Sequence, residues 1–433
     1  MAFYFIVKGM SKAKPEKQVG ILRPAGAGSE HPGGEGVPRT NQKFHKMITT
    51  STGLAEVEEL IPQFSNFVVG PADPEFPTTD FAIIRREGLL ALPLQAAFDP
   101  LQAADFGEAR VAFHRQLRLL KTIGRGSLPA GRIYEGHINA LHLIELYGTA
   151  AQQTYWAACA KERQHLFGIW NTEFQDGVSI HRISDDEYEL AGSKTFCSGA
   201  GEVDHMIITG HRMHGTENQG WQMVVVPLER MSQKRIDPSF WHPMGMEASA
   251  SYKVDFTGIR LQASDLLGGP DDYHLQPAFS GGAVRFAAVH LGGAEALLEH
   301  TRRQLRQRDR LDQPYQLHRL GRMAIAVEGG NQWLAGAAGH ALYAYNSAEQ
   351  VIEYANMVRT AISGICQEVM QLTLASIGVQ SCMKPNPVEQ IIRDLQTYLC
   401  QPNPDGALAS VGRYVGVADQ SVADLWNKET NHE

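Results

Sequence analysis

The 433-residue sequence contains few cysteines, no C-x-x-C pair and no long apolar run. Its five cysteines are scattered over positions 159, 197, 366, 382 and 400, and this odd, unclustered set argues against a disulfide framework or a structural zinc site. No apolar run approaches the roughly 18 residues that a membrane-spanning helix needs. We therefore expect a protein of a reducing, cytoplasmic compartment, with no metal site and no membrane span.

The sequence also lacks an excess of positive charge. The formal net charge is −8 and the pI is about 6.1, so nothing chain-wide favours binding to nucleic acid. Residues 1–53 are poor in apolar periodicity and contain a stretch rich in Gly and Pro at 20–40. Such a composition buries too little apolar area to offset the entropy of ordering, and we expect a disordered leader or a start-site artefact there.

The rest of the chain divides by pattern into three parts. Residues 54–165 repeat apolar positions at helical spacing, and Thr149 is a candidate N-cap. Residues 166–270 are short alternating β-branched and aromatic segments separated by turn signals, which predict a β-domain. Residues 271–433 return to long helical patterns and predict an antiparallel bundle. The expected fold is mainly α with a central β-domain.

Four motifs together resemble the acyl-CoA dehydrogenase family. These are NTE at 171–173, LAGSKTFCSGAGEVD at 190–204, WHPMGMEASASYKVDFTGIRL at 241–261 and PVEQIIRD at 387–394. The resemblance covers roughly residues 54–410. It implies an N-terminal helical domain, a middle β-barrel-like domain and a C-terminal four-helix bundle. It also implies bound FAD, a homodimer or homotetramer, and oxidation of a CH–CH bond in an acyl thioester.

The resemblance assigns cofactor roles to six residues. Thr172 would meet the flavin pyrimidine, Phe196 would lie against the isoalloxazine, and Ser198, two residues along the same strand, would reach toward flavin N5. Arg308 would bind the FAD pyrophosphate of a neighbouring subunit, since its forked donors match phosphate oxygens. Gly378 and Gln380 lie where the family has a Gly-rich turn against the cofactor, of which this chain keeps only the first Gly.

The catalytic base of the family is missing. Dehydrogenation needs a carboxylate to remove the α-proton of the substrate, and the two positions where the family places its Glu read Pro402 and Val284. The loop after the T-E motif, FQDGVSI at 174–180, is also shorter than the family's CoA-positioning loop. Asp405 and His137 are then the candidate catalytic residues, with Glu135 as an alternative to His137.

Three functions remain open from the sequence. The first is a dehydrogenase of acyl-CoA or a related small molecule, with its base supplied from elsewhere and an electron-transfer flavoprotein as redox partner. The second is a flavin monooxygenase of the same fold, which needs no such base and would receive its reduced flavin from a flavin reductase. The third is a catalytically silent flavoprotein scaffold, because a fold alone does not determine chemistry.

Overall fold

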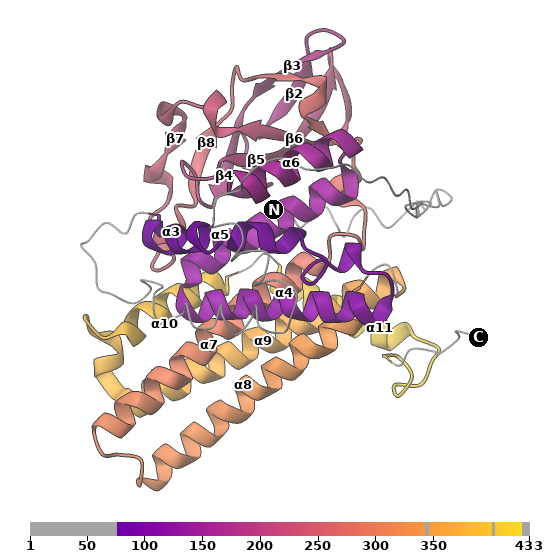
Figure 1. Ribbon diagram of the computed structural model, residues 1–433. Coiled ribbons are helices and arrows are strands. Elements are labelled where there is room, and N and C mark those ends of the chain that lie inside the picture. The colour runs from indigo at the N-terminus through magenta and orange to yellow at the C-terminus, as the bar shows by residue number, and fades with distance from the viewer. Residues whose placement is uncertain (1–75, 343–345, 401–402, 427–433) are drawn as a thin grey trace, which may run out of the picture.

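The structure is a computed structural model in which residues 76–342, 346–400 and 403–426 are described. The expected order of helices, β-domain and helices is confirmed. In Figure 1 the strands form the upper part of the molecule, the N-terminal helices lie below them, and the C-terminal helices form the lower part. The proposed disordered leader, residues 1–53, lies outside the described residues.

The N-terminal helices pack around one almost fully buried helix. This helix, α5 (Leu128–Tyr147), is capped by the side chain of Ser127, which accepts from the backbone N–H of Ala130. The predicted N-cap Thr149 is confirmed, since it forms a reciprocal capping box with Gln152. The other helices of this domain are α3 (Thr78–Arg86), α4 (Phe106–Gly126) and α6 (Ala150–Glu162).

The β-domain contains two sheets. The larger follows the order β10-β6-β5-β2-β3-β9, and β1 adds a parallel pairing to the first half of β5. The smaller has the order β4-β8-β7. The strands are β1 (Phe167–Trp170), β2 (Ser179–Arg182), β3 (Glu187–Ala191), β4 (Ser193–Cys197), β5 (His205–His214), β6 (Glu217–Pro227), β7 (Ile236–Asp237), β8 (Tyr252–Asp255), β9 (Arg260–Gln262) and β10 (Leu266–Leu267).

The C-terminal helices form a bundle in which α7 and α9 pack together and α8 packs on both. The segment 348–382 is long and apolar enough to cross a membrane by length and composition alone. Its helix, α9, contacts α7, α8 and α11, so we interpret it as the central helix of the bundle. The helices are α7 (Gly281–Gln307), α8 (Pro314–His340), α9 (Ala348–Ile377), α10 (Pro387–Tyr398) and α11 (Pro404–Val417).

The bundle reaches the N-terminal domain through a crossing of α4 and α7 that requires glycine. A Cβ atom added to Gly292 would lie 2.2 Å from the backbone oxygen of Lys121, and one added to Gly124 would lie 2.5 Å from the backbone oxygen of Val289. Both distances are far below van der Waals contact, so the two backbones approach each other through these glycines. The crossing fixes how α7 lies against the N-terminal helices.

We expect Gly292→Ala to lower the midpoint of thermal unfolding, because overpacking a tight interior costs about 1–3 kcal/mol. Gly412→Ala is the matched control, since a Cβ there meets nothing within 4 Å and helix propensity favours Ala over Gly by about 0.5–1 kcal/mol. Circular dichroism melts of both variants test this. Equal midpoints for Gly292→Ala and the wild-type protein would contradict the tight crossing.

Candidate functional site

Phe196 is held out of the β-domain by an irregular strand. The pairing of β4 with β8 shifts register between Lys194 and Cys197, as in a β-bulge, and Phe196 has a φ of 55°. A bulky residue rarely adopts that left-handed conformation, and such local strain is concentrated at functional sites. The side chain of Phe196 is 42% exposed although Thr195 and Cys197 are buried. The backbone thus presents one aromatic ring to the surface.

Three further rings gather around Phe196, and we call the four the aromatic cluster. The ring centroid of Phe196 lies 5.1 Å from Phe240, 6.0 Å from Trp241 and 6.2 Å from Phe174. Phe174 is 58% exposed, and it belongs to the short loop that follows the T-E motif. Exposed aromatic faces in one place are a surface on which a flat ring can stack.

A chain of hydroxyl groups lies beside this surface. The Oγ of Ser251 lies 2.8 Å from the Oγ of Ser198 and 2.8 Å from the Oγ of Ser249. The expected alternation from Phe196 to Ser198 along one strand is wrong, because the bulge intervenes and β4 ends at Cys197. Ser198 is instead placed by its backbone oxygen, which accepts from the Trp170 indole at 3.0 Å.

Thr172 is attached to the same strand. Its backbone oxygen accepts from the backbone N–H of Thr195 at 2.9 Å, directly before Phe196. The structure therefore brings Thr172, Phe196 and Ser198 to one edge of the smaller sheet. Together they provide an aromatic face and two hydroxyl-bearing residues, a set that suits a flat ring with heteroatoms at its edge.

A buried ion pair fixes the segment that carries Thr172. The fully buried Lys194 Nζ donates to Glu173 Oε2 at 2.5 Å and to the backbone oxygen of Asn171 at 3.1 Å. Burial lowers the pKa of Lys194, against the attraction of Glu173. Sequence reasoning did not find this pair, because Lys194 and Glu173 lie 21 positions apart. Glu173 is committed to the ion pair and does not act as a free base in this arrangement.

The β-domain is joined to the bundle at α10. The Asp394 carboxylate accepts from the backbone N–H of Met246 at 2.5 Å, and Arg393 donates to the backbone oxygen of Met244 at 2.8 Å. A Cβ on Gly245 would lie 2.2 Å from the Arg393 carbonyl. Arg393 and Asp394, the last two residues of the PVEQIIRD motif, thus hold the segment that leads to Ser249 and Ser251.

The family's base position on α7 is apolar and fully buried. Val284 has no exposed surface, and next to it the Arg285 Nε donates to Asn139 Oδ1 at 2.6 Å. Asn139 donates in turn to Glu135, which also pairs with Arg132. Burial lowers the pKa of Arg285 to about 10. Its Nη2 is buried without a hydrogen-bond partner among the described residues.

The candidate base His137 has both ring nitrogens engaged. Its Nδ1 accepts from the backbone N–H of Phe167 at 3.0 Å, so its Nε2 donates to the backbone oxygen of Leu90 at 2.9 Å. The ring has no exposed surface, and burial lowers its pKa to about 4. These contacts favour a structural role, and we do not carry the catalytic hypothesis for His137 or for the paired Glu135 further.

The second candidate base, Asp405, lies apart from the aromatic cluster. It is exposed and lies in the first turn of α11, a helix that packs against α9. An acidic residue in the first helical turn is an ordinary stabilising feature. Pro402 lies outside the described residues.

The remaining cofactor residues lie at the far end of the bundle. Arg308, at the C-terminal end of α7, donates to the side-chain oxygen of Gln380 and, at 3.3 Å, to that of Gln304. Gly378 has a φ of 76° and begins the turn that contains Gln380. In Figure 1 the end of α7 points away from the β-domain. One chain therefore brings Arg308, Gly378 and Gln380 together but does not bring them to Phe196.

Comparison with known proteins agrees with this architecture. Residues 284–400 match the family model "Acyl-CoA dehydrogenase, C-terminal domain". Among solved structures, the alignment with butyryl-CoA dehydrogenase from Megasphaera elsdenii covers 88% of this chain and 99% of that chain, with a TM-score of 0.68 and 16% identity. The chain therefore has the acyl-CoA dehydrogenase fold, and its residues 284–400 match that family's C-terminal domain.

Flavin monooxygenases are also among the similar proteins. Dibenzothiophene monooxygenase from Rhodococcus erythropolis is 25% identical over 279 residues, which cover 58% of this chain and 64% of that protein. The alignment thus spans less than two thirds of that relative. The structure of TdsC from Paenibacillus sp. A11-2 with FMN and indole has a TM-score of 0.73 at 18% identity and covers 84% of this chain and 96% of TdsC.

The Asp394 contact predicts a pH effect on stability. Burial raises the pKa of Asp394 from its ordinary 3.8 to about 6, so between these values the folded protein holds a proton that the unfolded chain has released. Stability contributed by this group is therefore present below pH 3.8 and is lost as the pH rises through 6. We expect Asp394→Asn, which keeps an acceptor for Met246, to gain stability relative to the wild-type protein between pH 4 and pH 7. Urea denaturation across this range tests it, and a constant difference would contradict it.

Proposed function

We propose that this protein is a flavin-dependent monooxygenase that receives reduced flavin from a flavin reductase and oxygenates a small apolar substrate. The observation that carries the proposal is the buried Val284 at a family base position. Glu135, the carboxylate in the hydrogen-bonded chain that starts at the neighbouring Arg285, is already bonded to Arg132 and Asn139. A monooxygenase needs no side chain to remove an α-proton, so it tolerates this arrangement, whereas a dehydrogenase would need a base from another position.

The residues at the edge of the smaller sheet fit a flavin. The exposed ring of Phe196 offers a face for the isoalloxazine, and Thr172 and Ser198 offer hydroxyl groups for its heteroatom edge. When bound, the reduced flavin would supply the electrons that activate dioxygen. Ser198 would hold a proton within the hydroxyl chain through Ser251 to Ser249, and the aromatic cluster would exclude water from the ring.

The identity of the flavin is part of the proposal. The resemblance in the sequence implies FAD, whereas the similar solved structures include TdsC with FMN and indole and XiaF from Streptomyces sp. with FADH2 and glycerol. XiaF has a TM-score of 0.69 at 17% identity. We propose FAD or FMN, to be separated by titration of each against the purified protein.

Oxidation of a CH–CH bond in an acyl thioester is the second candidate. The observation in its favour is the similarity to an acyl-CoA dehydrogenase of Bacillus subtilis, which extends over 78% of this chain and 91% of that protein at 23% identity. In that reaction the exposed Asp405 would be the remaining carboxylate from the sequence hypothesis, and an electron-transfer flavoprotein would accept the electrons. The shortened loop carrying Phe174 makes CoA positioning less favourable.

One experiment separates these functions. The protein is incubated with a flavin reductase, NADH, FMN or FAD, and either a panel of fused heteroaromatic compounds or a panel of acyl-CoA thioesters. A monooxygenase incorporates one atom from ¹⁸O₂ into an aromatic or heteroatom product. Anaerobic bleaching of bound oxidised flavin by an acyl-CoA would instead favour the dehydrogenase. Tight flavin binding with neither reaction would favour a silent scaffold.

We further propose that two copies of the chain complete each flavin site. Phe196 lies in β4 of the β-domain, whereas Arg308 follows the C-terminal end of α7, which points away from that domain (Figure 1). Both residues fit the same ligand, one through its ring and the other through a guanidinium that matches phosphate oxygens. The exposed apolar side chains of α8 provide area for such an assembly, including Tyr315 at 80% and Ile325 at 76% exposure. A homodimer or homotetramer would bring one copy's Arg308 to the other's β-domain.

Subunit mixing tests this arrangement. We expect Phe196→Ala and Arg308→Ala each to lower flavin retention on gel filtration by about 10-fold or more, as for loss of a stacking ring or a charge-assisted contact worth about 1.4 kcal/mol or more. Co-expressed variants should regain part of the retention, because some mixed sites contain neither substitution. The controls are Ile183→Ala and Arg306→Ala, both exposed. No recovery in verified mixed oligomers would contradict a shared site.

A further inference from the structure

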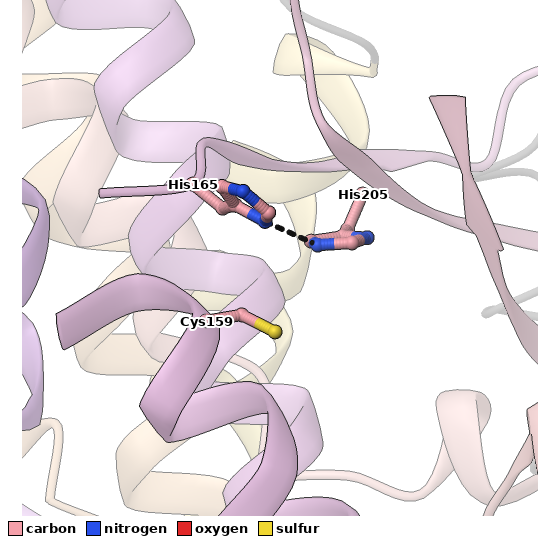
Figure 2. A group of neighbouring side chains, drawn as sticks. All are labelled: Cys159, His165 and His205. Atoms are coloured by element: carbon pink, nitrogen blue, oxygen red, sulfur yellow. Dashed lines mark hydrogen bonds between the residues drawn. The ribbon is translucent and has the colours of Figure 1, made fainter. Parts of the chain in front are cut away.

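Three potential metal ligands converge at the junction of α6 with the β-domain. Cys159, His165 and His205 each offer one ligand atom, and these atoms all lie within 4.8 Å of one another. Figure 2 shows an edge of the His165 ring facing an edge of the His205 ring, with the sulfur of Cys159 below the two rings. The facing nitrogens, His165 Nδ1 and His205 Nε2, are 2.8 Å apart. The flavin function uses none of these groups.

The end of α6 brings His165 back over Cys159. Cys159 lies in the last turn of the helix, and the chain reverses at Gln164, which has a φ of 52°. The backbone N–H of His165 then donates to the backbone oxygen of Cys159 at 3.1 Å. This bond joins residues six positions apart, one position more than the 6→1 bond of the Schellman motif. The local chain geometry therefore fixes the spacing of these two ligands.

The third ligand comes from a distant part of the chain and is fixed by sheet pairing. His205 is the first residue of β5, and its Cα lies opposite Phe167 of the parallel strand β1. Its backbone N–H donates to the backbone oxygen of Leu166 at 3.1 Å. Because His205 follows His165 by 40 positions, no C-x-x-C or H-x-x-H spacing in the sequence revealed the group.

The polar contacts around His205 leave a place for a metal ion. His205 directs its Nε2 at the Nδ1 of His165. Its Nδ1 is buried with no hydrogen-bond partner among the described residues. The neighbouring Asp204 carboxylate is committed to the backbone N–H of Leu166 and to Arg85. Among the described residues, no hydrogen bond from a carboxylate to either imidazole explains the pair without a cation.

We propose that Cys159, His165 and His205 bind a divalent transition metal of the zinc class. Thiolate and imidazole ligands suit this class, and tetrahedral zinc takes sulfur at about 2.3 Å and nitrogen at about 2.0–2.1 Å. Two such nitrogens lie about 3.3 Å apart, so the pair separated by 2.8 Å needs only a small opening. A metal bound here displaces the thiol proton of Cys159. A water molecule next to the half-buried side chain of His165 would be the fourth ligand of the metal.

The metal would act as a clip between two domains. Cys159 and His165 belong to the end of the N-terminal helices, whereas His205 belongs to the large sheet. The rings of Trp156 and Phe167 lie 4.8 Å and 4.9 Å from that of His205 and cover the site. Since the clip does not rely on the flavin residues, metal binding can be measured in the flavin-free protein.

The test is metal uptake by the full chain. Protein treated with a chelator and dialysed is titrated with Co²⁺, and tetrahedral thiolate coordination appears as visible absorption that Zn²⁺ then removes. We expect one metal per chain by elemental analysis and a higher unfolding midpoint with Zn²⁺. A second-shell change costs about 10–100-fold in metal affinity, so loss of a ligand in Cys159→Ala or His165→Ala should weaken binding by at least about 100-fold.

Matched variants make the outcome decisive. Cys382→Ser and Cys400→Ser alter exposed thiols and should leave the uptake unchanged, whereas His205→Cys should retain binding through a substitute ligand. If His205→Cys does not fold, the half-exposed His165→Ala still tests the site. Failure of the folded wild-type protein to bind Co²⁺ and Zn²⁺ would overturn the proposal. Equal binding by Cys159→Ala, or loss of binding in Cys382→Ser, would overturn it as well.

Discussion

The contact between α10 and the segment 244–251 is the constraint on which the candidate site depends. The Asp394 carboxylate holds the backbone N–H of Met246, and Gly245 lies so close to Arg393 that no side chain fits between them. Met246 and Ala250 both have positive φ values, 62° and 44°, which non-glycine residues rarely adopt. A buried carboxylate bonded to a backbone amide helps to offset the cost of such a conformation.

This strained segment determines where the hydroxyl groups lie. The backbone oxygens of Ser249 and Ala250 accept from Gly199 and Ala200, just after β4, so Ser251 is brought to 2.8 Å from Ser198. On the other side of Ser198 the bulge at Phe196 presents its ring. Two strained stretches thus flank the same group of hydroxyls. Their coincidence at one edge of the sheet supports a ligand site there better than any one residue does.

The sequence predicted the fold class, and it predicted the contacts of the candidate site only in part. The spacing of apolar residues in a segment such as 128–147 reflects the burial of the helix that the segment forms. This spacing is a local property, so it can be read from the sequence. The placement of Thr172, Phe196 and Ser198 at one edge was expected from resemblance, but the alternation argument failed at the bulge between Lys194 and Cys197. A bulge is set by the partner strand and by distant contacts, which a local pattern does not contain.

Contacts between distant positions explain what sequence reasoning missed. His137 lies on a helix whose pattern allows an outward face, yet the edge of β1 and the oxygen of Leu90 enclose it. The hydrogen bond from Met246 to Asp394 spans 148 positions, and the one from Arg285 to Asn139 spans 146. Such polar pairs are specific to one tertiary arrangement, because a buried polar group without its partner is costly.

Strand β1 links the two sites that the structure points to. Its first residue, Phe167, lies opposite His205 beside the proposed metal ligands, and Trp170 at its end holds the backbone of Ser198. Four strand residues span about 10 Å, so a metal at one end would not touch a flavin at the other. It would act by fixing the origin of a strand whose far end carries Asn171 and Thr172.

The N–H of Phe167 also binds His137, so the same strand ties the central helix α5 to the sheet. A short strand anchored at both ends can thus couple the stability of the domain junction to the position of the hydroxyl groups of the proposed flavin site, without any ligand common to the two sites.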